Sequence, residues 1–155
     1  MKVFITGGTG YIGAHLIKEL ISQGHQVHAL VRNIEKATQL PKEGLLLFKG
    51  DLGDSESIKE AMKGCDQVYH MGGDASIWAK DSSRYYTINV DGTRNVLDAA
   101  LELNVKRVVF TSTAGVLGPS HDGVVTEKKF RNIDFFNEYE SSKAMAESLV
   151  KSYVA

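Results

Sequence analysis

The stretch that decides the fold is KVFITGGTGYIGAHLIKELISQG, residues 2–24. It opens with an apolar run the length of one β-strand, turns through a glycine-rich segment and continues as an amphipathic stretch. This order predicts a strand, a tight turn and a helix that together bind a dinucleotide. Gly7 permits the turn, Gly10 lets backbone amides approach a pyrophosphate, and Gly13 lets the helix lie close to the sheet. The amides at the helix start then face the phosphates.

Length, charge and composition narrow the class of protein to which the chain can belong. The chain has 155 residues, 24% of them charged, and a formal net charge of −1. This fits one domain, residues 1–155, and gives no electrostatic case for nucleic acid or a membrane as partner. The five histidines show no metal-ligand spacing, so we expect no metal, and the single cysteine, Cys65, is expected in the core. No apolar run approaches the ~20 residues of a membrane span, and we expect a cytoplasmic protein.

Strand and helix patterns alternate along the chain, which predicts an α/β fold, a Rossmann-type doubly wound parallel sheet of about five strands flanked by helices. The third strand is uniformly apolar and is expected to be buried on both faces. The expected strands are 2–6, 26–31, 45–49, 66–70 and 106–111, and the expected helices run to Gly24 and over 33–40, 54–63, 82–104 and 136–153. Inward residues of the longest helix include Tyr86, Val90, Val96, Leu97 and Leu101.

Arg32 follows the second expected strand. An acidic residue at this point would accept hydrogen bonds from a ribose 2′-hydroxyl, whereas a cation pairs with a 2′-phosphate. Arg32 therefore favours NADP(H) over NAD(H), the alternative being an arginine that is merely solvated at the surface.

Three further features lie near the expected carboxyl edge of the sheet. Gly72 and Gly73 follow the fourth strand, which indicates backbone passing close to a ligand. Residues 118–134 show no periodicity, and a long irregular segment in a compact domain is more often functional than incidental, although a short helix near Phe130 is an alternative. Ser112 and Thr113 place hydroxyls at the end of the fifth strand.

Tyr139 and Lys143 are four residues apart on the last expected helix and so share one of its faces. An ammonium close to a phenol favours the phenolate, which suits a tyrosine that exchanges a proton with a carbonyl or alcohol. The same spacing is also common in ordinary helix surface pairs.

Five motifs at their separations resemble the extended short-chain dehydrogenase/reductases, the NAD-dependent epimerase/dehydratase superfamily. They are TGGTGYIG (6–13), the pair Asp51-Leu52, INVDGTRNVLDAA (88–100), VVFTSTAGVLG (108–118) and YESSK (139–143). Residues 76–81, SIWAKD, followed by YTINVDGTRNVL, look most like the dihydroflavonol 4-reductase branch, which prefers NADP.

The resemblance implies a role for each matching position. The proton donor or acceptor would be Tyr139, tuned by Lys143, with a hydroxyl from Thr113; Asn89 would be structural or part of a proton relay, unless it is a solvent-facing amide. The cofactor would lie along Gly7, Thr9, Gly10, Tyr11 and Ile12 (pyrophosphate), Arg32 (2′-phosphate), Asp51 and Leu52 (adenine), and Met71, Gly72, Gly73, Thr111, Tyr139 and Lys143 (nicotinamide side).

The chain departs from the family pattern in three ways. Thr113 stands where serine is usual, and keeps the hydroxyl with a stiffer rotamer. Met71-Gly72-Gly73 replaces small alanines. Family members also continue into further strands and a substrate-binding lobe, so the resemblance implies an N-terminal part that ends before them. The last two long helices form the dimer bundle in relatives, which implies a homodimer.

Three functions remain open on this basis. The first is an NADP(H)-dependent oxidoreductase that transfers hydride to a carbonyl of a small molecule. The second is a nucleotide-binding module without turnover, a redox sensor or assembly partner. The third is a sugar-nucleotide epimerase or dehydratase, which keeps NAD bound and which Arg32 disfavours.

Overall fold

The computed structural model describes residues 1–76, 78–120, 123–129 and 131–154. It confirms an α/β architecture with five parallel strands in the order β3-β2-β1-β4-β5. The strands are β1 (Lys2–Thr6), β2 (Gln26–Val31), β3 (Leu45–Lys49), β4 (Gln67–His70) and β5 (Arg107–Phe110). The helices are α1 (Tyr11–Ser22), α2 (Ser55–Met62), α3 (Ser83–Tyr86), the π-helix η1 (Thr87–Asp91), α4 (Gly92–Glu102), the 3₁₀-helix η2 (Ala114–Val116) and α5 (Glu138–Ser152).

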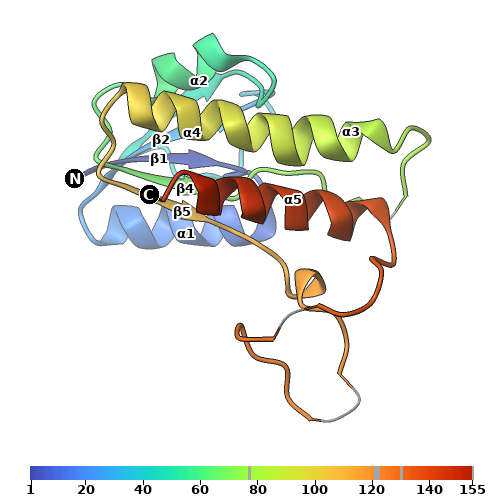
Figure 1. Ribbon diagram of the computed structural model, residues 1–155. Coiled ribbons are helices and arrows are strands. Elements are labelled where there is room, and N and C mark those ends of the chain that lie inside the picture. Colours follow the sequence, from blue (N-terminus) through green and yellow to red (C-terminus); the bar gives the residue numbers. More distant parts are fainter. Residues whose placement is uncertain (77, 121–122, 130, 155) are drawn as a thin grey trace.

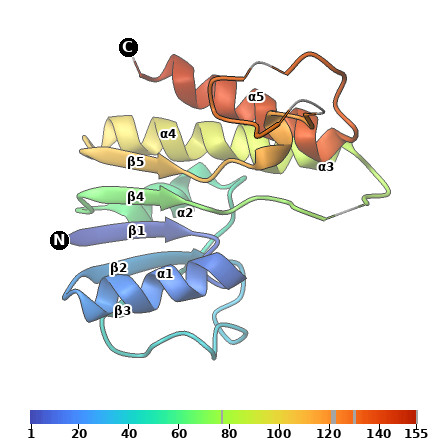
Figure 2. The ribbon, with the colours of Figure 1, turned by 90° about the horizontal axis from the view of Figure 1, so that it is seen from below.

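The helices cover the two faces of the sheet unequally (Figures 1 and 2). Helix α1 lies on one face, while α2 and α4 lie on the other, with α5 beside α4. The alternation of β1 explains both layers, because successive side chains of a strand point to opposite faces. Val3 and Ile5 pack in one buried cluster with Ile17 of α1, and Phe4 packs in the other with Ile58 of α2.

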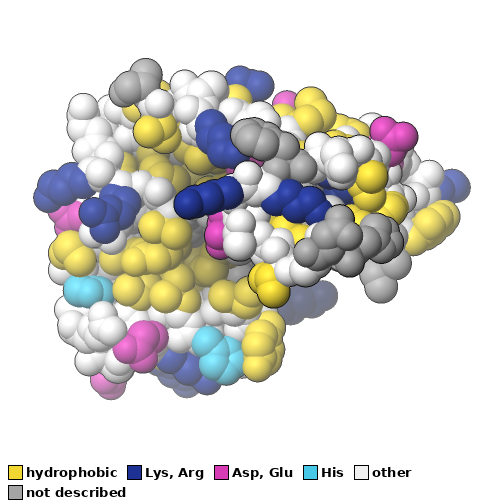
Figure 3. All heavy atoms as spheres, turned by 60° about the horizontal axis from the view of Figure 1, so that its bottom comes forward, with side chains coloured by type: hydrophobic (Ala, Val, Ile, Leu, Met, Phe, Trp, Pro, Cys, Tyr) yellow, Lys and Arg dark blue, Asp and Glu magenta, His cyan; other side chains and the backbone are white. Residues whose placement is uncertain are grey.

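The face of β5 on the α1 side is only partly covered. Val109 of β5 is 39% exposed, and hydrophobic side chains gather around a hollow on this side of the molecule (Figure 3). Among the described residues β5 pairs only with β4, so one edge of this strand is open. The described residues include no helix that is both long and apolar enough to cross a bilayer, and no group of three or more potential metal-binding side chains.

The helix expected over residues 33–40 is wrong. This segment forms successive turns instead: Asn33 Oδ1 accepts from the amide of Lys36, and the amides of Ala37 and Leu40 donate to carbonyls three residues earlier. An asparagine side chain that bonds the nearby backbone competes with a helix. Ala37 and Leu40 are buried, so packing rather than helix formation fixes the segment.

Two burial predictions are also wrong. Strand β3 is an edge strand, and Leu46 is 46% exposed, because a run of leucines reports hydrophobicity but not the position of its strand in the sheet. Leu101 is 63% exposed, because the buried arc of α4 is centred on Val96, Ala99 and Ala100 and Leu101 lies on its flank.

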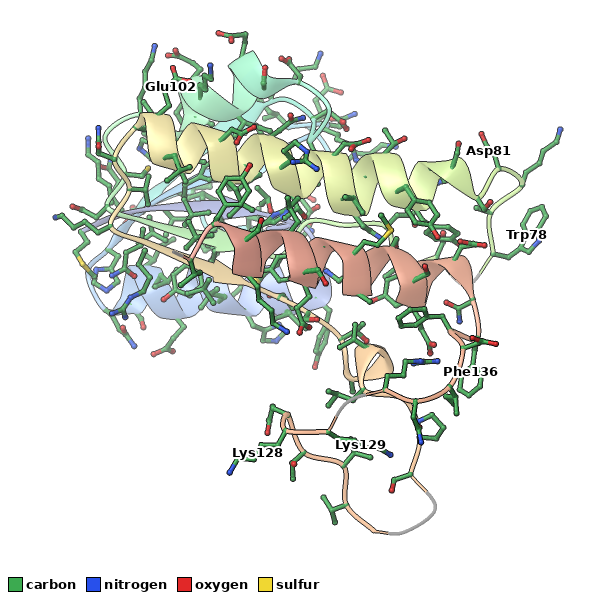
Figure 4. All side chains as sticks on the ribbon, in the orientation of Figure 1. Trp78, Asp81, Glu102, Lys128, Lys129 and Phe136 are labelled. Carbon is green, nitrogen blue, oxygen red and sulfur yellow. The ribbon has the colours of Figure 1, made fainter. Side chains whose placement is uncertain are left out.

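The described residues between η2 and α5 form no regular helix or strand and extend away from the sheet, with Lys128 and Lys129 among them (Figure 4). Its base is held by Arg131, which donates to the carbonyl oxygens of Gly115, Ile133 and Asp134 and pairs with Glu140 at 3.0 Å. The buried guanidinium thus joins η2 to the start of α5. The short helix considered near Phe130 centres on a residue outside the described ranges.

Candidate active site

A cleft opens at the carboxyl ends of β1, β2 and β4, with a volume of about 310 Å³. The chain winds outward from β1 to β3 and then returns to add β4 on the other side of β1, so the cleft lies where the strand order reverses. Ligands of open α/β sheets bind at this point. We call it the cofactor cleft, and its lining residues are Thr6, Gly7, Thr9, Gly10, Leu30, Val31, Arg32, Gly50, Asp51, Leu52, Met71, Gly72, Gly73, Asp74, Arg84 and Ile88.

The glycines of the first turn are required by space as well as by conformation. Gly7 has a φ of +74°, and a Cβ there would lie 2.7 Å from the backbone of Met71 and Gly72. A Cβ on Gly13 would lie 2.3 Å from the carbonyl oxygen of Gly7. The turn, the start of α1 and the end of β4 therefore pack backbone against backbone, which forms the floor of the cleft.

The start of α1 is left without an intramolecular cap. Its N-cap, Gly10, has no side chain to offer, and the first turn contains no acidic residue. By contrast, α2 is capped by Asp54, which accepts from the amides of Glu56 and Ser57. Uncapped helix amides need an acceptor, so the start of α1 fits the phosphates of a dinucleotide. Tyr11 and Ile12, predicted to contact the pyrophosphate, are 84% and 63% exposed beside this cleft rather than in its lining.

Arg32 lies exposed at the end of β2, where it lines both the cofactor cleft and a second hollow that it shares with Lys49, Asp51 and Asp54. The two carboxylates are occupied by backbone, since Asp51 accepts from Gly53 and Asp54 caps α2. No ion pair of Arg32 is recorded within the described parts of the chain. This end of the cleft therefore offers a free guanidinium.

Lys143 lies beside the end of β5, away from the lining of the cofactor cleft. Its side chain is 7% exposed, its Nζ donates to the carbonyl oxygen of Thr111 at 2.8 Å, and the ammonium lies 4.3 Å from the ring centre of Phe110. Tyr139 is half-buried one turn earlier, with its ring edge-on to Tyr85. We call Thr111, Ser112, Thr113, Tyr139, Lys143 and Glu147 the α5 corner.

Two charges in the α5 corner act on each other. Burial lowers the pKa of Lys143 to about 8, against the opposing effect of the Glu147 carboxylate four residues later. Hydrogen bonds from Lys151 and Ser112 hold the pKa of Glu147 below its ordinary value. Lys143 therefore titrates near working pH, and Glu147 supplies the charge that favours its ammonium form.

The two hydroxyls at the end of β5, those of Ser112 and Thr113, differ in the hydrogen bonds that they form. Ser112 Oγ donates to Glu147 Oε2 at 2.7 Å, which commits its hydrogen to the helix. Thr113 Oγ1 accepts from the amide of Gly115 at 3.2 Å and caps η2, so its own hydrogen remains to be donated. Of the two, the Thr113 hydroxyl is the one that can still bond an oxygen outside the chain.

A buried relay of hydrogen bonds runs beneath the cofactor cleft. The amide of Gly72 donates to Thr6 Oγ1, which lies 2.6 Å from His70 Nδ1; His70 Nε2 lies 2.9 Å from Thr93 Oγ1, which donates to the carbonyl oxygen of Asn89. Since the Thr93 hydroxyl donates to Asn89, its oxygen accepts from His70 Nε2, and in the neutral ring that burial favours Nδ1 accepts from the Thr6 hydroxyl. Complete burial lowers the pKa of His70 to about 3.

Asn89 extends this relay to α5. It is 1% exposed, its Oδ1 accepts from the amide of Asp74, and its Nδ2 donates to the carbonyl of Asp74 and to Ser142 Oγ. Ser142 in turn donates to the carbonyl of Tyr139. The solvent-facing alternative for Asn89 is wrong, and its side chain ties the cofactor cleft to the α5 corner.

Sequence reasoning predicted both regions but missed the side chains that support them. Glu147 continues the face of Tyr139 and Lys143 by one more turn, so helical spacing could have found it. His70, Thr93 and Arg84 carried no signal, since each depends on contacts between distant segments. Among the described residues, Thr111, Thr113, Tyr139 and Lys143 do not line the cofactor cleft.

Comparisons with known proteins agree with the motifs. The model of the NAD dependent epimerase/dehydratase family matches residues 3–155, which confirms the resemblance drawn from the sequence. A protein of Synechocystis sp. named for dihydroflavonol 4-reductase activity is 36% identical over 146 residues, 93% of this chain and 42% of that protein. Cinnamoyl-CoA reductase 1 of Petunia hybrida is 39% identical over 144 residues, 86% of this chain and 42% of that protein.

A solved structure agrees with the fold. The UDP-glucose 4-epimerase of Thermus thermophilus, in complex with NAD, is 30% identical with a TM-score of 0.86, and the match covers 99% of this chain and 50% of that one. The chain thus spans about half or less of the proteins that it matches.

Proposed function

Because the chain belongs to the NAD-dependent epimerase/dehydratase family, we propose that it carries the cofactor site of an NADP(H)-dependent oxidoreductase that reduces a carbonyl group. The bound nicotinamide dinucleotide would supply the hydride. The reductase names of two relatives support this choice of chemistry.

The observation that carries the proposal is the anchoring of Lys143 next to Tyr139. The buried ammonium of Lys143, held on the Thr111 carbonyl, has one fixed position at the end of β5, and its residue lies one helical turn after Tyr139. This fixed ammonium would stabilise negative charge at the end of β5, where the Tyr139 hydroxyl would give a proton to a carbonyl oxygen. Thr113 would orient that oxygen by donating its free hydroxyl hydrogen.

The preference for NADP(H) rests on Arg32. Its guanidinium is exposed at the end of β2, and the two carboxylates that line the same hollow, those of Asp51 and Asp54, accept from backbone amides. A planar guanidinium binds a phosphate through two parallel hydrogen bonds, whereas a 2′-hydroxyl is better served by a carboxylate.

Calorimetric titration of NADPH and NADH into the wild type and Arg32→Asp tests this preference. We expect tighter binding of NADPH by the wild type, and a preference that the substitution abolishes or reverses. Lys36→Asp is a matched control, since Lys36 is exposed, lies close to Arg32 in the chain and is not in the cleft lining. Equal affinities for the two nucleotides in both proteins would contradict the role given to Arg32.

A sugar-nucleotide epimerase is the second candidate. Its support is the matching fold of a UDP-glucose 4-epimerase in complex with NAD. An enzyme of that kind retains its dinucleotide, so chromatography of the acid-released supernatant from purified protein, which separates NAD from other nucleotides, distinguishes the two. Stoichiometric NAD would favour the epimerase, and protein purified without nucleotide would favour the reductase.

The homodimer implied by the resemblance is a further proposal. Helices α4 and α5 lie side by side, and Met145 of α5 is 50% exposed. Sedimentation velocity over a range of concentrations tests it, with Met145→Glu expected to shift the equilibrium towards monomer. A monomer at every concentration in the wild type would overturn it.

A further inference from the structure

We propose that Arg84 is a second cation of the cofactor cleft and binds the diphosphate of the dinucleotide. The proposal rests on the proposed function, since it takes the dinucleotide as the ligand. Arg84 is not part of any motif that led to the family, and it lies far from the glycine turn in the chain. It reaches the cleft because the segment after β4 brings α3 over the carboxyl edge.

The charged lining of the cofactor cleft divides into two pairs. Arg32 and Asp51 follow β2 and β3, while Asp74 and Arg84 lie beyond the end of β4. Since β1 separates β2 from β4, the ends of these strands are about 10 Å apart. An NADP molecule also carries two separated anionic groups, the 2′-phosphate and the diphosphate. The first matches Arg32, and the second lies towards the glycine turn and Arg84.

The glycine turn needs such a cation. Residues 7–13 contain no lysine or arginine, so the turn offers only backbone amides and the positive end of α1, equivalent to roughly half a charge. These groups balance only a small part of the negative charge of a bound diphosphate. Within the described lining of the cleft, Arg32 and Arg84 are the cations.

Asp74 holds Arg84 in place through Nε alone and leaves the two terminal nitrogens of the guanidinium available as donors. Arg84 Nε lies 2.5 Å from Asp74 Oδ2, and no partner is recorded for its two terminal nitrogens within the described residues. Asp74 itself is fixed, since Oδ1 accepts from the amide and hydroxyl of Ser76 and its backbone is bridged by Asn89. The guanidinium is half-exposed, so its free side is accessible to a ligand.

The carboxylate of Asp74 does not cancel this role. Burial works to raise its pKa, but the hydrogen bonds from Ser76 and the charge of Arg84 outweigh it and hold the pKa below the ordinary value. Asp74 is therefore a buried anion turned towards Ser76 and Arg84 Nε, while the terminal nitrogens of Arg84 keep their donors. A guanidinium oriented in this way can bind two phosphate oxygens at once.

Titration of NADPH and of adenosine 2′-monophosphate into the wild type, Arg84→Gln and Arg84→Lys tests the proposal. The monophosphate carries the 2′-phosphate but no diphosphate. We expect Arg84→Gln to weaken NADPH binding about tenfold, which is the usual value of a hydrogen bond to a charged group, and to leave the monophosphate unaffected. Arg84→Lys should lie in between, since it keeps the charge but loses the anchor on Asp74. Arg107→Gln, which removes a charge at the opposite end of the sheet, should leave both affinities unchanged.

A third arm separates the cofactor from another phosphate-bearing ligand as the source of the anion. If Arg84→Gln leaves NADPH binding unchanged but abolishes binding of inorganic pyrophosphate to the NADPH-saturated protein, the cofactor is overturned as the source and Arg84 remains a phosphate site. If Arg84→Gln changes neither the binding of NADPH nor the binding of pyrophosphate, and thermal melting shows that the variant is folded, the proposal is overturned. If the wild type binds neither NADPH nor NADH, the proposed function is overturned, and the dinucleotide is excluded as the ligand of Arg84.

Discussion

The starts of α1 and α5 show how differently the two halves of the site are built. Helix α1 begins at a glycine with no capping side chain and no acidic residue in its first turn. Helix α5 begins at Asn137, which accepts from the amide of Glu140, and has Glu138 and Glu140 in its first turn. The start of α1 is left for a ligand to satisfy, whereas α5 satisfies its own backbone and presents side chains from its face.

The same contrast extends through each region. The cofactor cleft has glycines such as Gly7 and Gly72 where a Cβ would lie less than 3.0 Å from other atoms, so ligand binding there depends on the shape of the backbone. In the α5 corner Lys143, Ser112 and Thr113 each have a protein partner, and it depends on hydrogen bonds and charge. Substitutions should therefore affect binding and stability in the first region, and proton transfer in the second.

The largest effect expected separates chemistry from binding. Tyr139→Phe removes the proton donor and should slow carbonyl reduction about 100-fold or more while NADPH affinity is unchanged. Stopped-flow fluorescence of NADPH with a panel of ketones and aldehydes measures the rate, and calorimetry measures the affinity. Tyr153→Phe is the matched control, since its hydroxyl bonds Asp98 at the far end of α5. Equal rates for Tyr139→Phe and the wild type would exclude Tyr139 as the donor.

The reverse pattern is expected in the cofactor cleft. Gly13→Ala forces a Cβ against the carbonyl of Gly7, so it should lower the free energy of unfolding by about 1–3 kcal/mol and impair NADPH binding. Urea unfolding and calorimetry measure the two effects. Gly53→Ala serves as control because its Cβ would meet only Asp51 Oδ1 at 3.4 Å. If both variants behave alike, the close packing at Gly13 is not what shapes the turn.

The relay under the cofactor cleft predicts a dependence of stability on acid. His70 titrates near 3 in the folded chain and near 6.5 when unfolded, so below pH 6.5 the unfolded chain binds a proton that the folded chain does not. From pH 7 to 5 this lowers the free energy of unfolding by about 2 kcal/mol. Urea unfolding at both pH values should show that the free energy of unfolding falls less between pH 7 and pH 5 in His70→Gln than in the wild type. His15→Gln, at an exposed site, should lose as much free energy of unfolding on acidification as the wild type. If His70→Gln also loses as much as the wild type, the interpretation of His70 as a buried neutral histidine is contradicted.

The smallest effect concerns the charge in the α5 corner. Lys143 has a pKa of about 8 when folded and 10.5 when unfolded, so the unfolded chain binds more protons between these values and this lysine makes folding more favourable as pH rises through that range. Glu147→Gln removes the carboxylate that favours the ammonium, and should lower the midpoint of Lys143. A pH titration of lysine side-chain carbon resonances measures it, with Lys106, whose pKa Asp66 raises, as the internal reference. An unchanged midpoint would show that Glu147 does not act on Lys143.

Local patterns explain which predictions succeeded. The five strands and the helices that flank them follow from runs of apolar residues and from caps such as Asp54, because these signals act over a few neighbouring residues. The segment 33–40 failed because side-chain bonds and burial of Ala37 and Leu40 outweighed helix propensity. The position of β3 at the edge failed because strand order is a property of the whole chain.

The sequence by itself determined the glycine turn, the strand that precedes it and the helical face shared by Tyr139 and Lys143, since spacing along one element fixes these. Only the tertiary structure decided that Arg84 reaches the cleft of the glycine turn, that His70 is held neutral between Thr6 and Thr93, and that Asn89 joins the cleft to α5. The physical reason is that these contacts join side chains from separate elements, and their geometry exists only after the sheet has brought those elements together.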